Sequence, residues 1–201
     1  MRINCAFLSA LTGINEDWFA NWSDAHSGQE ATMRTNETPH YDTSVNTTGC
    51  CPKFNPGGWD DQELHFRDKP FVRAVTHSVM HVPVNMGSVF ARVNRHIDDA
   101  GASAEGQSIV LSRDLSPWSS EHLFSVSKPV PEEAMTTLSG DFVTKVFEGP
   151  YSQARQWHEE MQQVARDRKL EPGDVYFFYT TCPKCAETYG KNYVVGVAAV
   201  G

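Results

Sequence analysis

Residues 71–77 read FVRAVTH, and residues 142–148, which lie 71 positions further along the chain, read FVTKVFE. Both stretches begin with Phe-Val and carry another valine three positions later. Because β-branched and aromatic side chains are enriched in β-strands, both stretches are predicted to be strands. Similarity at a fixed offset indicates that the chain is built from two related halves.

The same offset relates two stretches with helical periodicity. Apolar residues spaced i, i+4 and i+7 begin at Met86 and, 71 positions later, at Trp157. This spacing places the apolar side chains on one face of a helix, where they can be buried. Helices are therefore predicted over about residues 83–99 and 151–169.

Each half is completed by further strands, and the prolines of PVPEE (129–133) indicate a linker between the halves. The sequence thus predicts an α+β fold with two β-α-β-β halves, about residues 60–130 and 131–201. The halves are expected to pack about a pseudo-twofold axis, with an antiparallel sheet, two main helices and a central ligand cleft. The predicted strands are ELHFR (63–67), residues 71–77, EHLFSVS (121–127), AMTTLSG (134–140), residues 141–147 and NYVVGVAA (192–199).

Composition narrows the classes of function. The chain has 201 residues, of which 40% are hydrophobic and 21% charged, as in a globular domain. A net charge of −8 argues against nucleic-acid binding, which needs a basic surface. Since no apolar run reaches about 18 residues, no membrane association is expected, and the chain is predicted to be cytoplasmic.

Residues 1–46 differ in character from the rest of the chain. They are acidic, rich in Asn, Ser and Thr, and lack sustained periodicity, so they are predicted to form a polar N-terminal arm preceding a domain at 47–201. Trp18, Phe19 and Trp22 could anchor this arm on the protein's own surface, on a second copy of the chain or on a protein partner.

The second half carries a resemblance to a known family. The stretch TTLSGDFVTKVFEGPYSQARQWHEEM, with Ser139-Gly140, Gly149-Pro150-Tyr151 and Trp157, resembles the gyrase-inhibitor-like (GyrI-like) domain. The resemblance covers about residues 60–201 and implies two β-α-β-β repeats. It also implies a cleft that takes hydrophobic or cationic small molecules. One branch of the family looks like hydrolases that open the cyclopropane ring of DNA-alkylating natural products.

The Gly-Pro-Tyr corner supplies the candidate catalytic residues. Gly149 can end a strand at positive φ, and Pro150 suits the first position of a helix. Glu148 and Tyr151 would then border the cleft, as a base and a hydrogen-bond donor. The 71-residue offset places His77 opposite Glu148, so the two could share acid and base roles. A structural interpretation stays open, in which Glu148 favours the helix N-terminus and Tyr151 packs.

Aromatic and acidic residues elsewhere are candidates for ligand binding. Alternation in the strand VYFFY sends Tyr176 and Phe178 to one face and Tyr179 to the other. One of these faces is expected to line the cleft and the other to join the core. Trp118 and Glu121, before a closing strand, could cover a ligand, although a Trp in such a loop can also be a packing residue.

Four of the five cysteines lie in two stretches that echo each other, NTTGCCPKF and YTTCPKCAE. Cys50, Cys51, Cys182 and Cys185 could bind structural zinc, remain reduced thiols or form a redox pair. Cys182 and Cys185 are predicted to lie in a loop, which weakens the redox interpretation. No cofactor is favoured, and zinc is kept as the alternative. In each case the two loops are expected to dock on each other.

Three functions remain open from the sequence. The first is a small-molecule hydrolase for detoxification or self-protection, in which a carboxylate activates water. The second is a non-catalytic module that binds or sequesters a drug in the same cleft. The third is a gyrase-inhibitor-like module that contacts a protein through its arm.

Overall fold

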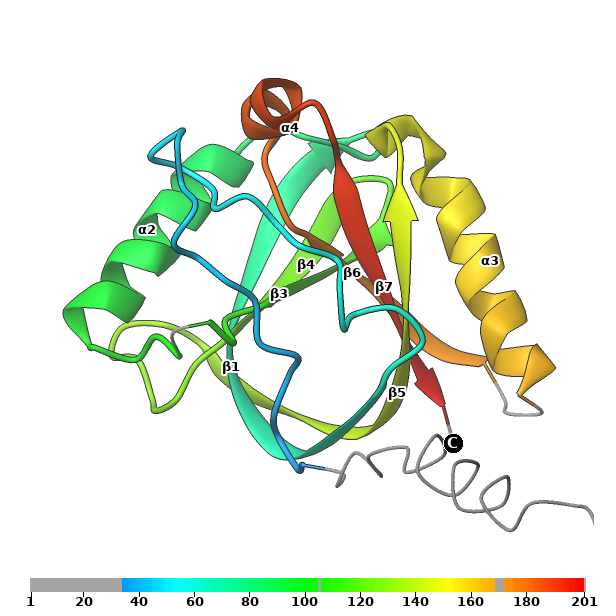
Figure 1. Cartoon of the computed structure of the whole chain (residues 1–201). Helices are drawn as coiled ribbons and strands as arrows, with labels where there is room; N and C mark the ends of the chain where they lie inside the picture. The colour runs from blue at the N-terminus through cyan, green and yellow to red at the C-terminus, as the bar shows by residue number, and fades with distance from the viewer. Residues whose placement is uncertain (1–33, 105, 169–171, 201) are drawn as a thin grey trace, which may run out of the picture. The chain divides into compact units, whose positions relative to one another are not determined.

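The computed structural model describes residues 34–104, 106–168 and 172–200, all within the compact unit Met33–Gly201. The predicted anchors Trp18, Phe19 and Trp22 lie outside the described residues. Strands and helices follow one another in an α+β order (Figure 1). The elements are β1 (Glu63–Val79), β2 (Val82–Pro83), α2 (Met86–Asp99), β3 (Val110–Ser116), β4 (Ser119–Ser125), β5 (Met135–Glu148), the 3-10 turn η1 (Tyr151–Gln153), α3 (Ala154–Asp167), β6 (Pro172–Tyr179), α4 (Pro183–Tyr189) and β7 (Tyr193–Val200).

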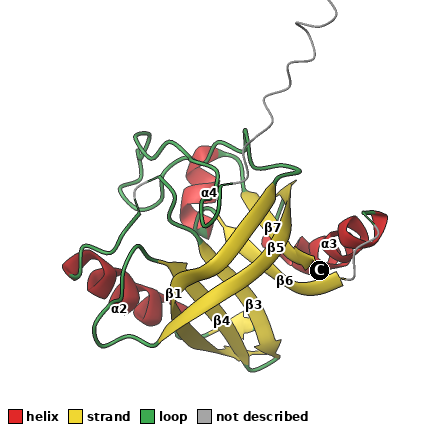
Figure 2. Cartoon of the chain, turned by 90° about the horizontal axis from the view of Figure 1, so that it is seen from below, coloured by secondary structure: helices red, strands yellow, loops and turns green. Residues whose placement is uncertain are grey.

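The strands form one antiparallel sheet that closes on itself. Its order is β2-β1-β4-β3-β6-β7-β5, and β5 pairs back to β1. Figure 2 shows the strands wrapping into a barrel with α2 and α3 on opposite flanks. Among the strands of the described residues, closure leaves only the short β2 at an edge, since each of the six longer strands has a neighbour on both sides.

β1 and β5 are long because each joins two predicted strands. ELHFR and residues 71–77 form the single strand β1, and AMTTLSG joins residues 141–147 in β5. The prediction of separate leading strands was therefore wrong. A register shift between Phe66 and Lys69 absorbs the irregular backbone at Asp68, which has φ of +51°, and β1 then resumes its pairing with β5.

The two predicted main helices are confirmed. α2 packs its buried Val93 and Ile97 onto the outer faces of β1 and β4, and α3 packs Trp157 and Met161 onto β5, β6 and β7. The order strand, helix, strand, strand occurs twice along the chain. The second copy carries an additional helix, α4, between β6 and β7.

The barrel interior is a packed core. Phe66, Phe71 and Phe142 pack with Leu111 and Val195 inside the barrel. Apolar groups from several strands are thereby removed from water, and this burial drives closure. The predicted central cleft between the halves does not appear in this interior, because aromatic and aliphatic side chains fill it.

The segment 34–62 lies against the barrel and contributes to the same core. Phe54 and Trp59 pack against Phe178, with ring centroids 5.9 and 5.6 Å from it. The Tyr41 hydroxyl donates a hydrogen bond to the carbonyl of Ser108, at 2.7 Å. Residues 34–46, which the sequence assigns to the arm, thus include part of the barrel's packing.

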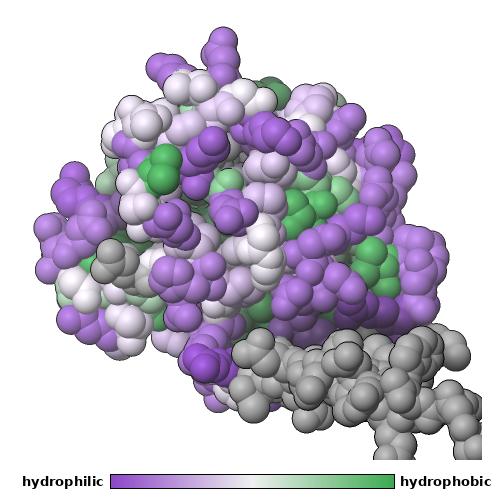
Figure 3. Space-filling model, viewed as in Figure 1, coloured by the Kyte–Doolittle hydropathy of each residue, from purple (hydrophilic) through white to green (hydrophobic). Residues whose placement is uncertain are grey.

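Apolar side chains on the face shown in Figure 3 lie in separate small patches within a largely hydrophilic surface. Among the described residues, no helix is both long and apolar enough to cross a membrane.

Trp59 offers a test of the interior packing. Its side chain is fully buried, so Trp59→Ala removes a large apolar group and leaves a cavity. We expect a loss of about 3–5 kcal/mol in the free energy of unfolding. Urea denaturation followed by circular dichroism measures it.

Trp118→Ala is the matched control, because 58% of the Trp118 side chain is exposed and its loss should change stability by no more than about 0.5 kcal/mol. Equal losses in the two variants would show that the segment carrying Trp59 does not pack into the barrel as described.

Candidate functional site

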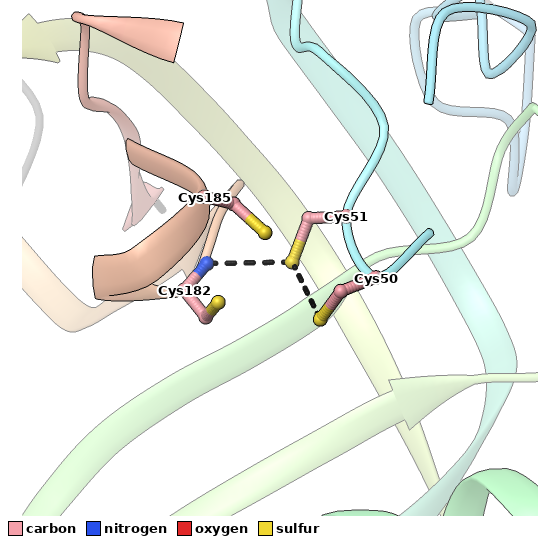
Figure 4. Close-up of side chains that lie close together, drawn as sticks. All are labelled: Cys50, Cys51, Cys182 and Cys185. Carbon is pink, nitrogen blue, oxygen red and sulfur yellow. Dashed lines mark hydrogen bonds between the residues drawn. The ribbon is translucent and has the colours of Figure 1, made fainter. Parts of the chain in front are cut away.

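Four cysteine side chains converge where the segment 34–62 meets α4. The Sγ atoms of Cys50, Cys51, Cys182 and Cys185 all lie within 4.8 Å of one another (Figure 4). The backbone N–H of Cys182 donates to the Cys51 Sγ at 3.4 Å, across 131 positions of sequence. The expected docking of the two loops is therefore confirmed.

The second pair of cysteines sits at the start of a helix. Cys182 precedes α4, Pro183 occupies its first turn, and Gly190 ends it with φ of +70°. Proline at the start and glycine at the end are the usual boundary signals of a helix. The prediction of a loop holds for Cys182 but was wrong for Cys185, which lies in α4. It therefore no longer weighs against the redox interpretation.

Thr48 organises the first cysteine pair. Its Oγ1 accepts hydrogen bonds from the backbone N–H groups of Cys50 and Cys51, at 3.3 and 3.4 Å, and lies 3.3 Å from the Cys185 Sγ. The contact with Thr48 lowers the pKa of the Cys185 thiol to about 7. Burial raises the pKa of Cys51. The Cys51 and Cys185 thiols therefore differ in their readiness to ionise.

A surface pocket of about 430 Å³ adjoins the cysteines. One wall comes from the segment 34–62 and the other from the β6–α4–β7 region. Tyr189 belongs to both features, because it lines the pocket while its hydroxyl donates to the Cys51 carbonyl at 2.8 Å. The lining residues are Asp42, Val45, Lys53, Phe54, Asn55, Pro56, Thr180, Thr181, Tyr189, Lys191 and Tyr193.

The three predicted catalytic residues have separate partners. Glu148 ends β5, is half exposed, and forms an ion pair with Lys191 at 3.2 Å. The Tyr151 hydroxyl donates to the Thr181 carbonyl at 2.6 Å. His77 has an exposed side chain on β1, opposite Ser119 of β4. Glu148 and Tyr151 thus adjoin the pocket through its lining residues, whereas the backbone of His77 is hydrogen-bonded to Asn85 and Val84, which do not line it.

Glu121 is buried in a network of charges. Its carboxylate accepts hydrogen bonds from the Nε atoms of Arg73, at 2.5 Å, and Arg113, at 2.8 Å. Arg113 also pairs with Asp174 and stacks over the Tyr176 ring, with its guanidinium carbon 5.0 Å from the centroid. Two cations satisfy this carboxylate, as burial of a charge requires.

The predicted aromatic ligand-binding residues divide between core and surface. Tyr176 and Phe178 are buried in the barrel interior. Tyr179 points to the other face, where its ring lies 5.7 Å from that of Tyr151 and remains partly exposed. Trp118 is exposed at the turn between β3 and β4. Only Tyr179 and Trp118 of these four present substantial surface to solvent.

His122 is a buried histidine that the sequence analysis did not single out. Its Nε2 lies 2.9 Å from the Thr76 Oγ1 and its Nδ1 lies 2.9 Å from the Ser112 Oγ. The Phe90 ring of α2 covers it, at 4.9 Å between centroids. Burial lowers the pKa of His122 to about 4, so the ring is neutral at neutral pH.

A second histidine is held by a carboxylate at the surface. His81 Nδ1 lies 2.6 Å from Asp114 Oδ2, and Asp114 Oδ1 accepts a hydrogen bond from the Ser120 hydroxyl at 2.7 Å. Neither His81 nor Asp114 was among the site residues predicted from the sequence. The stretch VMHV (79–82) lacks the Asn-Gly type of turn signal, so the sequence did not predict the two-residue hairpin that places His81 beside β3 and β4.

This hairpin turn has an unusual backbone. Val79 pairs with Val82, so Met80 and His81 are the two turn residues, and their φ angles are +49° and +70°. Turns of this kind favour Asn and Gly, because positive φ is costly for larger side chains. The His81 backbone N–H donates to the Pro117 carbonyl at 2.9 Å, which fixes the hairpin against the β3–β4 turn.

The fold and these sites define a small closed antiparallel barrel flanked by two helices, with ionisable side chains grouped where strands end. The chain belongs to the family described as Bacterial hydrolase, whose model matches residues 41–200. The GyrI-like resemblance is not confirmed by a family match. The chain matches no curated protein.

Among solved structures, an uncharacterized conserved protein from Listeria innocua is similar to this chain. It is 12% identical, with a TM-score of 0.52 over 71% of this chain and 92% of that one. At this identity the likeness concerns the fold alone.

The buried imidazole of His122 predicts a pH dependence of stability. Its pKa is about 4 in the folded chain against 6.5 when exposed, so the unfolded chain takes up this proton first. The contribution of His122 to the free energy of unfolding is therefore complete above pH 6.5. It decreases as the pH falls toward 4, by about 3 kcal/mol in total. NMR titration of the imidazole resonances should give a midpoint near 4 for His122.

Urea denaturation of His122→Gln at several pH values gives a second measurement. In this variant the free energy of unfolding should no longer show the decrease between pH 6.5 and 4 that His122 causes. His77→Gln, which changes an exposed ring, should keep it. A His122 resonance that titrates near pH 6.5 would contradict the assignment.

Proposed function

We propose that this protein is a hydrolase that acts on a small apolar substrate, with water activated by His81 and Asp114. The observation that carries the proposal is the 2.6 Å contact between His81 Nδ1 and Asp114 Oδ2 at a surface with exposed apolar side chains. Membership of the Bacterial hydrolase family supports the reaction class.

The geometry suits a general base. In the neutral ring with its proton on Nδ1, His81 donates to Asp114, and Nε2 is left as a free acceptor. Because the Ser120 hydroxyl holds the other oxygen of Asp114, the carboxylate and the ring are both oriented. Nε2 takes a proton from water as the water oxygen attacks an electrophilic carbon. Asp114 stabilises the resulting imidazolium, which then returns the proton to the leaving group.

Backbone strain supports a functional role for this turn. Non-glycine residues at positive φ cost of the order of 1 kcal/mol or more each, and such residues gather at functional sites. Met80 and His81 adopt this conformation in succession. The turn holds the imidazole at hydrogen-bond distance from Asp114. An unstrained loop would restrict the position of the ring less.

Apolar side chains beside the pair provide a surface for substrate. Met80 and Val82 are exposed on the hairpin, Leu115 is exposed near the end of β3, and Trp118 is exposed on the β3–β4 turn. The two turns are joined by the hydrogen bond from Ser78 N–H to the Trp118 carbonyl, at 2.8 Å. Such a surface favours a hydrophobic electrophile, the kind of molecule that a detoxification or self-protection enzyme removes.

The predicted pseudo-twofold relation between the halves is part of this proposal. The twice-repeated order of elements supports it, and the 71-residue offset carries Met80 onto Tyr151. The turn after β1 and the corner after β5 would then be equivalent positions. Glu148, at that corner, is the second candidate for the base, because its partner Lys191 lines the pocket.

Esters of p-nitrophenol test the proposal, with acetate and octanoate as short and long acyl groups. We expect saturable hydrolysis with a preference for octanoate. His81→Asn should lower kcat/KM by about 10²- to 10⁴-fold, because it removes the base while asparagine tolerates positive φ. Asp114→Asn should also lower it. Trp118→Ala should raise KM for octanoate more than it changes kcat.

His77→Gln is the matched control and should retain the rate of the unmodified chain, and Glu148→Gln, which tests the second candidate base, should retain it too if His81 is the base. Loss of activity in Glu148→Gln together with full activity in His81→Asn would transfer the role of base to Glu148. Saturable binding of the esters with no turnover by the unmodified chain would favour the alternative, a non-catalytic binding module.

A further inference from the structure

The four-cysteine cluster has the spacing of a metal site. In a tetrahedral zinc site with four thiolates, Zn–S distances of about 2.3 Å separate neighbouring sulfurs by about 3.8 Å. All four Sγ atoms lie within 4.8 Å of one another, and those of Cys50 and Cys51 are 3.6 Å apart. Small side-chain rotations therefore suffice to place every sulfur on one ion.

A backbone hydrogen-bond donor is already directed at one of these sulfurs. The backbone N–H of Cys182 donates to the Cys51 Sγ, and the Cys185 thiol donates to the Thr48 Oγ1, which could donate to the sulfur once Cys185 is a thiolate. Donors of this kind stabilise the negative charge of thiolates bound to a metal. Neutral thiols that only fill space in the core carry no negative charge for such donors to stabilise.

The backbones that carry the cysteines are held from outside the cluster. Thr48 accepts from the N–H groups of both Cys50 and Cys51, and Tyr189 of α4 donates to the Cys51 carbonyl. The two adjacent cysteines are thus fixed relative to the helix that begins after Cys182. Such outer contacts orient ligands before the metal binds.

We propose that Cys50, Cys51, Cys182 and Cys185 bind one zinc ion as four thiolates. The ion joins the segment 34–62 to the β6–α4–β7 region, which are the two walls of the surface pocket. With four protein ligands the coordination is closed, so the metal holds the pocket together and leaves no position for substrate water. The site is independent of the proposed reaction at His81.

Elemental analysis of the full chain, purified with reductant and without added chelator, tests the site directly. We expect about one zinc per chain. Cobalt exchanged into the protein should show the intense visible bands and the thiolate-to-metal charge transfer of a tetrahedral four-sulfur site. Iron in place of zinc, or fewer than about 0.1 metal ions per chain, would overturn the proposal.

Cysteine variants locate the ligands. Cys51→Ser and Cys185→Ser should lose the metal and lower the Tm, because binding of metal to the folded state contributes to stability. The fifth cysteine gives the control, since Cys5→Ser should keep both. A Cys51→Ser variant that retains a full equivalent of zinc bound as in the unmodified chain would contradict the assignment.

The reaction rate of the thiols in the unmodified chain provides a test that does not require these variants to fold. Four thiols of the unmodified chain should react with a disulfide reagent at least about tenfold more slowly with zinc bound than after its removal by chelator. Equal rates in the two states would overturn the proposal. The proposal would also be overturned if protein prepared in the presence of zinc bound no metal and contained a Cys182–Cys185 disulfide. That result would indicate a redox pair instead.

Discussion

The pairing of β1 with β5 closes the sheet, and the rest of the structure depends on this closure. These strands are long enough to pair with each other and with a further neighbour on the opposite side, β4 for β1 and β7 for β5. Once the barrel is closed, apolar residues of alternate positions meet inside it, while the other positions face α2 or α3. The helices therefore pack outside, and no ligand cleft divides the interior.

Closure of the barrel also creates the surface against which the segment 34–62 packs. Phe54 and Trp59 pack against the barrel's own Phe178, so the segment is held by buried aromatic surface as well as by hydrogen bonds. This anchoring carries Cys50 and Cys51 to α4 and forms one wall of the pocket. The pocket and the sulfur cluster are consequences of the same docking.

Much of the fold could be predicted because its signals are local. The apolar spacing that begins at Met86 and at Trp157 identified both long helices, since side-chain burial follows helical periodicity directly. The helix α4 could also have been found, because Pro183 and Gly190 mark its two ends. The alternation of side chains around Tyr176 could be predicted from the sequence. It did not show which face of the strand lies inside the barrel.

By itself, the sequence determined the two long helices with their buried faces, the strands at 71–77 and 142–147 and the echo between the two cysteine stretches. Only the tertiary structure decided that the sheet closes, that Tyr176 and Phe178 are core, and that Glu121 is held by Arg73 and Arg113. The pairing of His81 with Asp114 likewise joins residues 33 positions apart. Such contacts depend on strand register and turn geometry, which arise from packing across the whole barrel and leave no periodic trace in the chain.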